Sequence, residues 1–105
     1  MDLFELEGLR QQAGMVSQLL KALSNPNRLM ILCSLMEKER VSVSELNLSL
    51  PLSQSALSQH LAVLRRDNLV STSREAQTIY YFLADEKIAV LVATLYHLYC
   101  KPEPA

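Results

Sequence analysis

The chain has 105 residues, of which half are hydrophobic and 20% are charged. This length accommodates one domain and is too short for two, so any regulatory function must share the same core. Only two residues are glycine, and this composition suits a compact, mainly helical protein better than a β-sandwich or a disordered chain. We therefore expect a single domain over residues 1–105.

The net charge of −1 and the isoelectric point near 6.1 argue against a general binder of polyanions. Such binders need clustered lysine and arginine for their phosphate contacts. Residues 13–84 carry seven basic against five acidic side chains, whereas residues 1–12 carry one against three. This small central surplus supports a nucleic-acid function only weakly, so that function must rest on a motif.

Neither a membrane anchor nor a secretory signal is expected. The longest nearly uncharged apolar stretch covers the 13 residues 88–100, whereas a membrane-spanning helix needs roughly 20. The chain begins with Asp2, Glu5 and Glu7 among apolar residues, which is the wrong charge for the basic start of a signal peptide. We expect a cytoplasmic protein that makes no contact with membranes.

Two helices come first along the chain. Apolar residues recur at three- and four-residue steps, the spacing of one helix face, and predict a helix over 4–23. The segment Ser24-Asn25-Pro26 then offers a capping side chain and a first-turn proline, whose missing N–H is not needed there. Apolar residues continue at helical spacing, so a second helix is predicted over 26–38.

A pair of shorter helices follows. After a brief β-prone run, Ser44 can cap a helix of two turns over 44–50. Ser53 can cap the next helix, over 53–67. The buried stripe of this helix consists of Leu57, Leu61 and Leu64. Two helices joined by so short a turn predict a helix-turn-helix over 44–67.

A β-hairpin is predicted after these helices. Residues 69–73 and 78–83 are both β-prone, and the polar residues 74–77 join them as a four-residue turn. A hairpin in this position is expected to form a wing over 69–83, beside the helix-turn-helix.

The last helix is predicted over 85–100, with Asp85 as its cap. Among its final 13 residues only Thr94 and His97 fall outside the aliphatic, aromatic and cysteine set. A domain this small cannot cover such a helix, so we expect a twofold homodimer in which it packs, with residues 1–23, against its copy. The fold class is therefore mainly α with a small β-hairpin wing, a winged helix-turn-helix of order α-α-α-α-β-β-α.

The helix predicted over 53–67 carries short, uncharged hydrogen-bonding side chains near its start. Gln54, Ser55, Ser58 and Gln59 fall on the face opposite its leucines. A glutamine can pair with an adenine edge and a serine can bond to a base or a phosphate, so this cluster suits readout of the major groove. The alternative is an ordinary solvated face. Nearby arginines suit contacts with phosphates or the minor groove. The candidate DNA-binding residues are Ser53, Gln54, Ser55, Ser58, Gln59, His60, Arg65, Arg66, Arg74 and Gln77.

Two blocks of the sequence resemble the ArsR/SmtB family of bacterial repressors. The block from Leu23 to Leu32 is similar to a segment that marks the family's second helix. The block from Ser53 to Val70 is similar to its recognition helix and the entry to its wing. The resemblance covers roughly residues 15–100 and implies a transcriptional regulator that binds double-stranded DNA at an inverted-repeat operator.

The chain has two cysteines, Cys33 and Cys100, too few for a disulfide scaffold. Their local sequences, the block after Ser53 and the wing residues 75–77 resemble the HlyU, BigR and SqrR subgroup of the family. That resemblance implies a cysteine pair across the second and last helices, which reacts with persulfides or oxidants to form a disulfide or polysulfide bridge. Carried over, Cys33 and Cys100 form a thiol switch that controls operator affinity.

A thiol switch needs a reactive thiolate, and a nearby cation lowers the pKa of a thiol. Lys101 adjoins Cys100, and His97 lies three residues before it on the same helix face. Alternatively, Cys33 is an inert residue that packs like any small hydrophobic side chain, and His97 is an ordinary packed or surface histidine without a function.

Two other regulators stay open as alternatives. A metal-responsive repressor would need ligands on the last helix, which offers Asp85, His97 and Cys100 but places Lys87 at an expected ligand position. A second family site needs a Cys-x-Cys-type motif in residues 45–50, which contain no cysteine. We therefore predict neither a metal site nor a cofactor. The other alternative is an activator that works by displacing another DNA-bound protein.

An enzymatic function is not expected. The sequence has no Cys-x-x-Cys motif, no glycine-rich phosphate loop and no convincing set of nucleophile, base and orienting residue.

Overall fold

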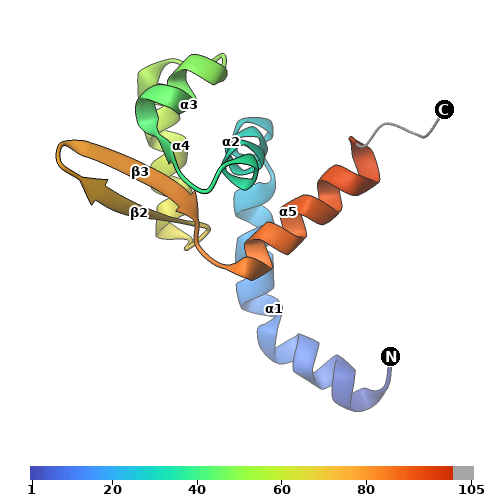
Figure 1. Cartoon of the computed structure of the whole chain (residues 1–105). Coiled ribbons are helices and arrows are strands. Elements are labelled where there is room, and N and C mark those ends of the chain that lie inside the picture. The colour runs from blue at the N-terminus through green and yellow to red at the C-terminus, as the bar shows by residue number, and fades with distance from the viewer. Residues whose placement is uncertain (101–105) are drawn as a thin grey trace.

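The computed structural model describes residues 1–100, which form five helices and a three-stranded antiparallel sheet (Figure 1). The elements in chain order are α1 (Leu3–Leu23), α2 (Pro26–Glu37), β1 (Val41–Ser42), α3 (Val43–Ser49), α4 (Gln54–Arg66), β2 (Val70–Glu75), β3 (Thr78–Leu83) and α5 (Glu86–Tyr99). The expected mainly α winged helix-turn-helix is confirmed. The strand β1 is an addition to the expected order.

Side-chain caps define where the helices begin. The Asn25 side chain accepts hydrogen bonds from the N–H groups of Asn27 and Arg28, at 2.9 and 3.1 Å, which places Pro26 in the first turn of α2. Asp85 caps α5 by accepting from the N–H of Ile88 at 3.0 Å. Both caps lie where the sequence predicted them.

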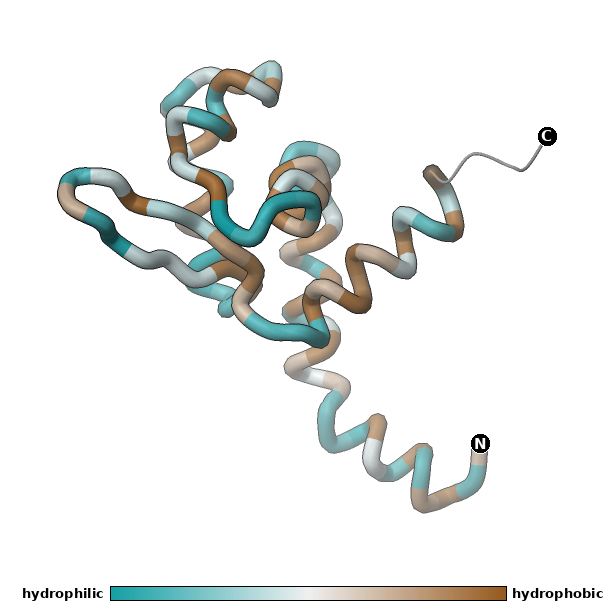
Figure 2. Tube along the Cα trace, in the orientation of Figure 1, coloured by the Kyte–Doolittle hydropathy of each residue, from teal (hydrophilic) through white to brown (hydrophobic). Residues whose placement is uncertain are grey.

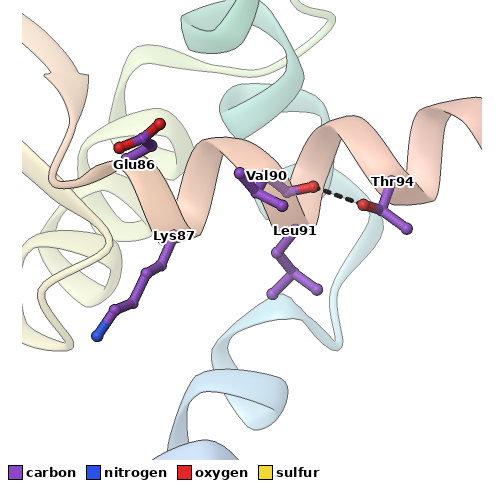
Figure 3. Close-up of a pocket in the computed structure, with 5 residues that line it drawn as sticks. All are labelled: Glu86, Lys87, Val90, Leu91 and Thr94. Atoms are coloured by element: carbon purple, nitrogen blue, oxygen red, sulfur yellow. Dashed lines mark hydrogen bonds between the residues drawn. The ribbon is translucent and has the colours of Figure 1, made fainter.

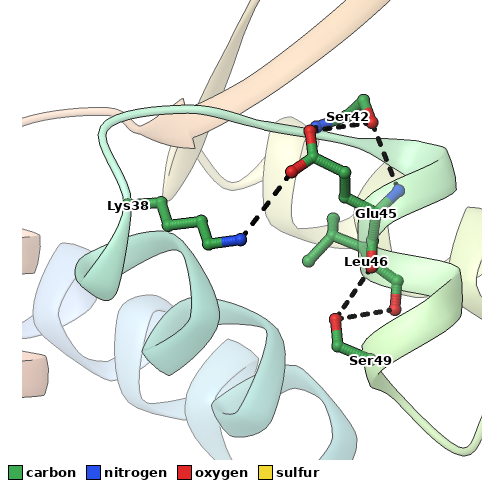
Figure 4. Close-up of polar contacts among 5 residues, drawn as sticks. All are labelled: Lys38, Ser42, Glu45, Leu46 and Ser49. Carbon is green, nitrogen blue, oxygen red and sulfur yellow. Dashed lines mark hydrogen bonds and ion pairs between the residues drawn. The ribbon is translucent and has the colours of Figure 1, made fainter.

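The start of α3 differs from the prediction. Ser42, and not Ser44, is the N-cap: its hydroxyl accepts from the N–H of Glu45 at 3.2 Å, and the Glu45 carboxylate accepts from the Ser42 N–H at 3.3 Å. Each residue thus satisfies the other's N–H in a capping box (Figure 4). Ser42 also belongs to β1, so strand and helix join without a loop.

Helix α4 ends in a Schellman motif. The N–H of Leu69 donates to the carbonyl of Leu64 at 2.9 Å, and the N–H of Asn68 donates to Arg65 at 3.1 Å. Asn68 takes the left-handed backbone conformation that this motif needs, with φ of 61°. The motif turns the chain from α4 into the wing.

The wing is a hairpin that is tighter than predicted. Val70 pairs with Leu83 at its base and Glu75 pairs with Thr78 at its tip, so the turn consists of two residues, Ala76 and Gln77, instead of residues 74–77. Ala76 has φ of 54°, an uncommon conformation for a residue other than glycine. On its other side β3 pairs with β1, giving the strand order β1-β3-β2.

The core lies between α2, α3, α4, the start of the wing and α5. Its fully buried side chains are Ile31, Leu32, Leu46, Leu57, Leu61, Leu64, Leu69 and Val92. The leucine stripe predicted for α4 therefore packs inward and leaves the opposite face of that helix in solvent.

Parts of α1 and α5 leave this core. The N-terminal half of α1 and the C-terminal half of α5 project from the body, and hydrophobic residues continue along both (Figures 1 and 2). Phe4 is 92% exposed and Leu98 is 69% exposed. The radius of gyration is 15.6 Å, against roughly 13 Å for a compact chain of this length. None of the described helices is long and apolar enough to cross a membrane.

Candidate DNA-binding surface and cysteine pair

Most of the candidate DNA-reading residues lie on one exposed face at the start of α4. Gln54, Ser55, Ser58 and Gln59 are all exposed, and His60 is half-buried. Ser53 precedes the helix, and its hydroxyl caps it by accepting from the N–H of Ala56 at 3.1 Å. The first two turns of α4 therefore present uncharged donors and acceptors to solvent, as the major groove requires.

The candidate arginines lie at two other places. Arg65 and Arg66 are exposed in the last turn of α4, where Arg66 is held by Asp67 through contacts of 3.3 and 3.4 Å. At the wing tip, the Arg74 Nε donates to the carbonyl of Ala76 at 3.2 Å, and Gln77 lies exposed in the turn. The candidate residues therefore lie in three separate regions: the exposed face at the start of α4, the end of α4 and the wing tip.

A further polar side chain, Asn47 on α3, adjoins this surface and was not selected from the sequence. Together with Val43, Ser44 and Gln54 it lines a groove of about 160 Å³ between α3 and the start of α4. Its Oδ1 atom is buried and has no hydrogen-bond partner within residues 1–100. The signal in the sequence was a lone asparagine between the leucines of α3.

One ion pair links the end of α2 to α3. The Lys38 Nζ lies 3.8 Å from the Glu45 carboxylate, which also accepts from the Ser42 hydroxyl at 3.1 Å (Figure 4). Both Lys38 and Glu45 are exposed, so the pair places no charge in the core. An exposed pair at this distance is a weak link between the end of α2 and the first helix of the helix-turn-helix.

The two cysteines lie on packed helices. Cys33 is half-buried against the core on α2, and Cys100 is exposed as the C-cap residue of α5. Helices α2 and α5 contact one another, and both thiols are free. The structure therefore brings together the elements that carry the two cysteines, although these are 67 positions apart in the sequence.

Two features of its surroundings raise the pKa of the Cys33 thiol. Burial is the larger cause, and the negative charge of a Cys100 thiolate raises the pKa further. His97 is exposed and packs edge-on against Tyr96, and Lys101 lies outside the described residues.

The residues considered as metal ligands are separated. Asp85 is occupied as the cap of α5, at the opposite end of that helix from His97 and Cys100. A helix of this length spans about 20 Å, so these three side chains cannot meet within one chain. Residues 1–100 contain no group of three or more side chains placed to hold a metal ion.

Comparisons with known proteins agree with this geometry. Residues 25–72 match the family described as bacterial regulatory protein, arsR family. The transcriptional activator HlyU of Vibrio cholerae is 48% identical over 91% of this chain and 88% of its own length. The biofilm growth-associated repressor of Agrobacterium fabrum is 45% identical over 93% of this chain and 83% of its own length.

A solved structure supports the same assignment. Reduced HlyU from Vibrio cholerae superposes with a TM-score of 0.83 at 46% identity, covering 90% of this chain and 99% of the other. These relatives are transcriptional regulators, which confirms the expectation that the protein is not an enzyme. The chain belongs to the ArsR family of bacterial regulatory proteins and is a winged helix-turn-helix transcriptional regulator.

Proposed function

We propose that the protein acts in the cytoplasm as a homodimer on an inverted-repeat operator, and that a Cys33–Cys100 thiol switch controls its affinity for this DNA. The observation that supports the switch is the contact between α2, which carries Cys33, and α5, which ends at Cys100, with both thiols free. The domain from 1 to 105 then divides into dimerisation helices (1–23 and 85–100), the helix-turn-helix (44–67) and the wing (69–83).

DNA reading is assigned to the exposed face of α4. Gln54 and Gln59 are the residues suited to base edges, whereas Arg65 and Arg74 suit phosphates. Gln54→Ala or Gln59→Ala is expected to weaken binding to the protein's own upstream DNA by roughly 1–3 kcal/mol and to relax sequence preference.

Fluorescence anisotropy with labelled DNA measures this loss. Ser34→Ala is the control, since Ser34 is a polar residue of α2 that lies outside both the proposed DNA-reading face and the proposed dimerisation helices. Arg65→Gln is expected to weaken binding to all sequences alike. The slope of the logarithm of affinity against the logarithm of salt concentration should fall by about one, as for the loss of one phosphate contact. Glutamine variants that keep both affinity and preference would contradict base reading by α4.

Dimerisation is assigned to the apolar faces of α1 and α5. An open hollow of about 450 Å³ is bordered by residues of α5 alone: Glu86, Lys87, Val90, Leu91 and Thr94 (Figure 3). Val90 is 59% exposed there. A second copy of the chain covers this face in our proposal, because a twofold axis buries two like surfaces against each other.

The chemistry of the switch follows from the unequal exposure of the thiols. The exposed Cys100 thiolate attacks the outer sulfur of a low-molecular-weight persulfide, takes up that sulfur and releases the corresponding thiol. The Cys33 thiolate then attacks the Cys100 sulfur atom and expels hydrosulfide. One persulfide and two cysteines thus give one disulfide, one thiol and hydrogen sulfide. An oxidant that forms a sulfenic acid on Cys100 leads to the same disulfide with loss of water.

Bridge formation can be measured by mass spectrometry of the intact protein and its peptides. Persulfide treatment is expected to remove two hydrogen atoms and to link the Cys33 and Cys100 peptides, or to link them with added sulfur. In Cys33→Ser, Cys100 is expected to keep the added sulfur because the second thiol is missing. Unmodified thiols in the treated wild-type protein would contradict the switch.

The sign of regulation is a separate question, since one relative is named an activator and another a repressor. We propose repression by the reduced dimer, with release on bridge formation. In a deletion strain, a reporter fused to the regulated promoter should then rise. A fall would favour the alternative, an activator that displaces another DNA-bound protein.

A further inference from the structure

A short connection between α2 and β1 contacts both α3, the first helix of the helix-turn-helix, and the wing. It consists of Lys38, Glu39 and Arg40, and it begins directly after the helix that carries Cys33. Lys38 pairs with Glu45 on α3, and Arg40 pairs with Glu75 on the wing. None of the DNA-binding residues selected from the sequence lies in this connection.

The contact with the wing is the more specific of the two. The Arg40 guanidinium makes two parallel contacts with the Glu75 carboxylate, Nη1 to Oε1 at 2.8 Å and Nη2 to Oε2 at 3.0 Å. Its Cζ atom also lies 4.1 Å from the centre of the Tyr80 ring. A planar guanidinium that is both paired with a carboxylate and stacked on an aromatic ring is fixed in orientation.

The strand register explains why these three residues meet. Ser42 of β1 and Ser73 of β2 both pair with Tyr80 on β3. Glu75, two residues beyond Ser73 on β2, shares the face of Tyr80. Arg40 directly precedes β1 and meets both side chains on that face. The guanidinium therefore reaches across the middle strand and ties the far strand of the wing to the end of α2.

The contact with α3 is weaker. Lys38 approaches Glu45 with one nitrogen at 3.8 Å, and the Glu45 carboxylate is already occupied by the N–H and hydroxyl of Ser42. A lysine ammonium also lacks the planar geometry that fixes an arginine. The wing is consequently the part that the connection can orient.

We propose that Arg40 is a positioning residue that sets the inclination of the wing and transmits displacements of α2 to it. Cys33 lies one helical turn before the end of α2, so a bridge that pulls this helix also moves the connection. Arg40 then shifts Glu75 and, with it, the wing tip that carries Arg74 and Gln77. This transmission rests on the proposed thiol switch, whereas the positioning of the wing rests only on DNA binding.

A direct contact between Arg40 and a phosphate is the competing explanation, and the Glu75→Gln variant separates the two. Removing an acidic group near DNA strengthens binding if charge alone matters. If Arg40 positions the wing, Glu75→Gln must weaken binding, because it releases the guanidinium. We expect Arg40→Gln and Glu75→Gln each to weaken binding of the reduced protein to its own upstream DNA by roughly three- to tenfold, and the double variant to weaken it no further.

Lys38→Gln is the matched control, since Lys38 is an exposed cation of the same connection that pairs with Glu45 on α3 and not with the wing. Hydrogen exchange of the amides in 70–83 reports the wing directly, and it should rise in both wing variants while that of α4 stays unchanged. Thermal denaturation shows whether the variants fold. Stronger binding by Glu75→Gln, or a wing whose exchange is unaltered, would overturn the positioning role.

Transmission is tested by the ratio of affinities before and after persulfide treatment. In Arg40→Gln this ratio should shrink at least threefold relative to the wild-type protein, although mass spectrometry finds the same Cys33–Cys100 bridge. An unchanged ratio overturns transmission and leaves the switch intact. A wild-type protein without any change in affinity overturns the switch and transmission together, whereas the reduced-state affinities still decide the positioning role.

Discussion

The two cysteine side chains differ in exposure, and in the proposed switch this difference sets the order of their reactions. Cys100 ends α5 in solvent, whereas Cys33 is half-buried and its pKa is raised by burial and by the charge of Cys100. A raised pKa leaves less thiolate at neutral pH, and the thiolate is the nucleophile. Cys100 therefore suits the first attack and Cys33 the second.

Alkylation rates are expected to follow the same order. Iodoacetamide at neutral pH should modify Cys100 before Cys33, and the rate at Cys33 should rise with pH over a higher range than that of free cysteine, because its pKa is raised. Peptide mass spectrometry over a time course gives both rates. In Cys100→Ser the Cys33 profile should move back toward lower pH, since one cause of the shift is removed. Faster modification of Cys33 than of Cys100 would contradict the assigned order.

For single residues, the sequence predicts a structural role correctly where that role depends only on neighbouring residues in the chain. Asn25, Ser53 and Asp85 cap the helices as expected, because an N-cap acts on N–H groups only two or three residues ahead. The sequence predicted Ser44 as the N-cap of α3, whereas the structure has Ser42. Either serine can act as the cap, since each is followed three residues later by a residue that can lie in a first helical turn. Only the pairing of Glu45 with Ser42 decides between them.

Among the elements, the end of α4 matters most for the wing, because the left-handed Asn68 turns the chain toward β2. Asn68→Ala is expected to lower the free energy of unfolding by about 1 kcal/mol, since alanine tolerates this conformation less well than asparagine. Asn68→Gly should keep or slightly raise it. Urea denaturation measures both variants. Equal free energies of unfolding for the Asn68→Ala and wild-type proteins would show that the left-handed conformation of the Schellman motif does not limit which residue is tolerated at this position.

The two features of the sheet that were missed have different physical causes. Residues 41–43 are β-prone, but strand β1 has only two residues and forms through pairing with β3, about 40 positions later, and no local pattern displays that pairing. The turn at Ala76 and Gln77 lacks the Asn-Gly or Asp-Gly signal of a two-residue hairpin, so a longer turn was expected. Long helices with regular apolar spacing were predicted to within a residue or two, because their signal is repeated many times.

At the scale of the whole molecule, the projecting halves of α1 and α5 expose the apolar surface that we propose a second copy of the chain covers (Figure 1). Their exposed apolar residues and the large radius of gyration are unusual for a chain that acts alone. Val90→Glu places a charge in the middle of the exposed face of α5 and is expected to convert a dimer into monomers. Sedimentation velocity measures the change, and binding to an inverted repeat should fall with it.

Leu48→Glu is the matched control for this change. Leu48 is 90% exposed on α3, away from both dimerisation helices, so this variant should sediment as the wild-type protein does. A Val90→Glu protein that remains dimeric would show that the face of α5 is not the interface.

The sequence could not show whether Cys33 and Cys100 lie near one another, because their placement depends on the packing of α2 against α5. Their pairing came from family resemblance, and the structure adds the contact between the helices and the influence of one thiol on the other. The DNA-reading face, in contrast, follows from the spacing of its own residues along α4.

The most direct test is the affinity of the protein for its own upstream DNA, measured by fluorescence anisotropy with both thiols reduced and after persulfide treatment. The account predicts tight binding by the reduced protein and a loss of roughly 10- to 150-fold after treatment, absent in Cys33→Ser and Cys100→Ser and reversed by dithiothreitol. Equal affinity of the reduced and treated wild-type proteins, with the bridge present, would contradict it.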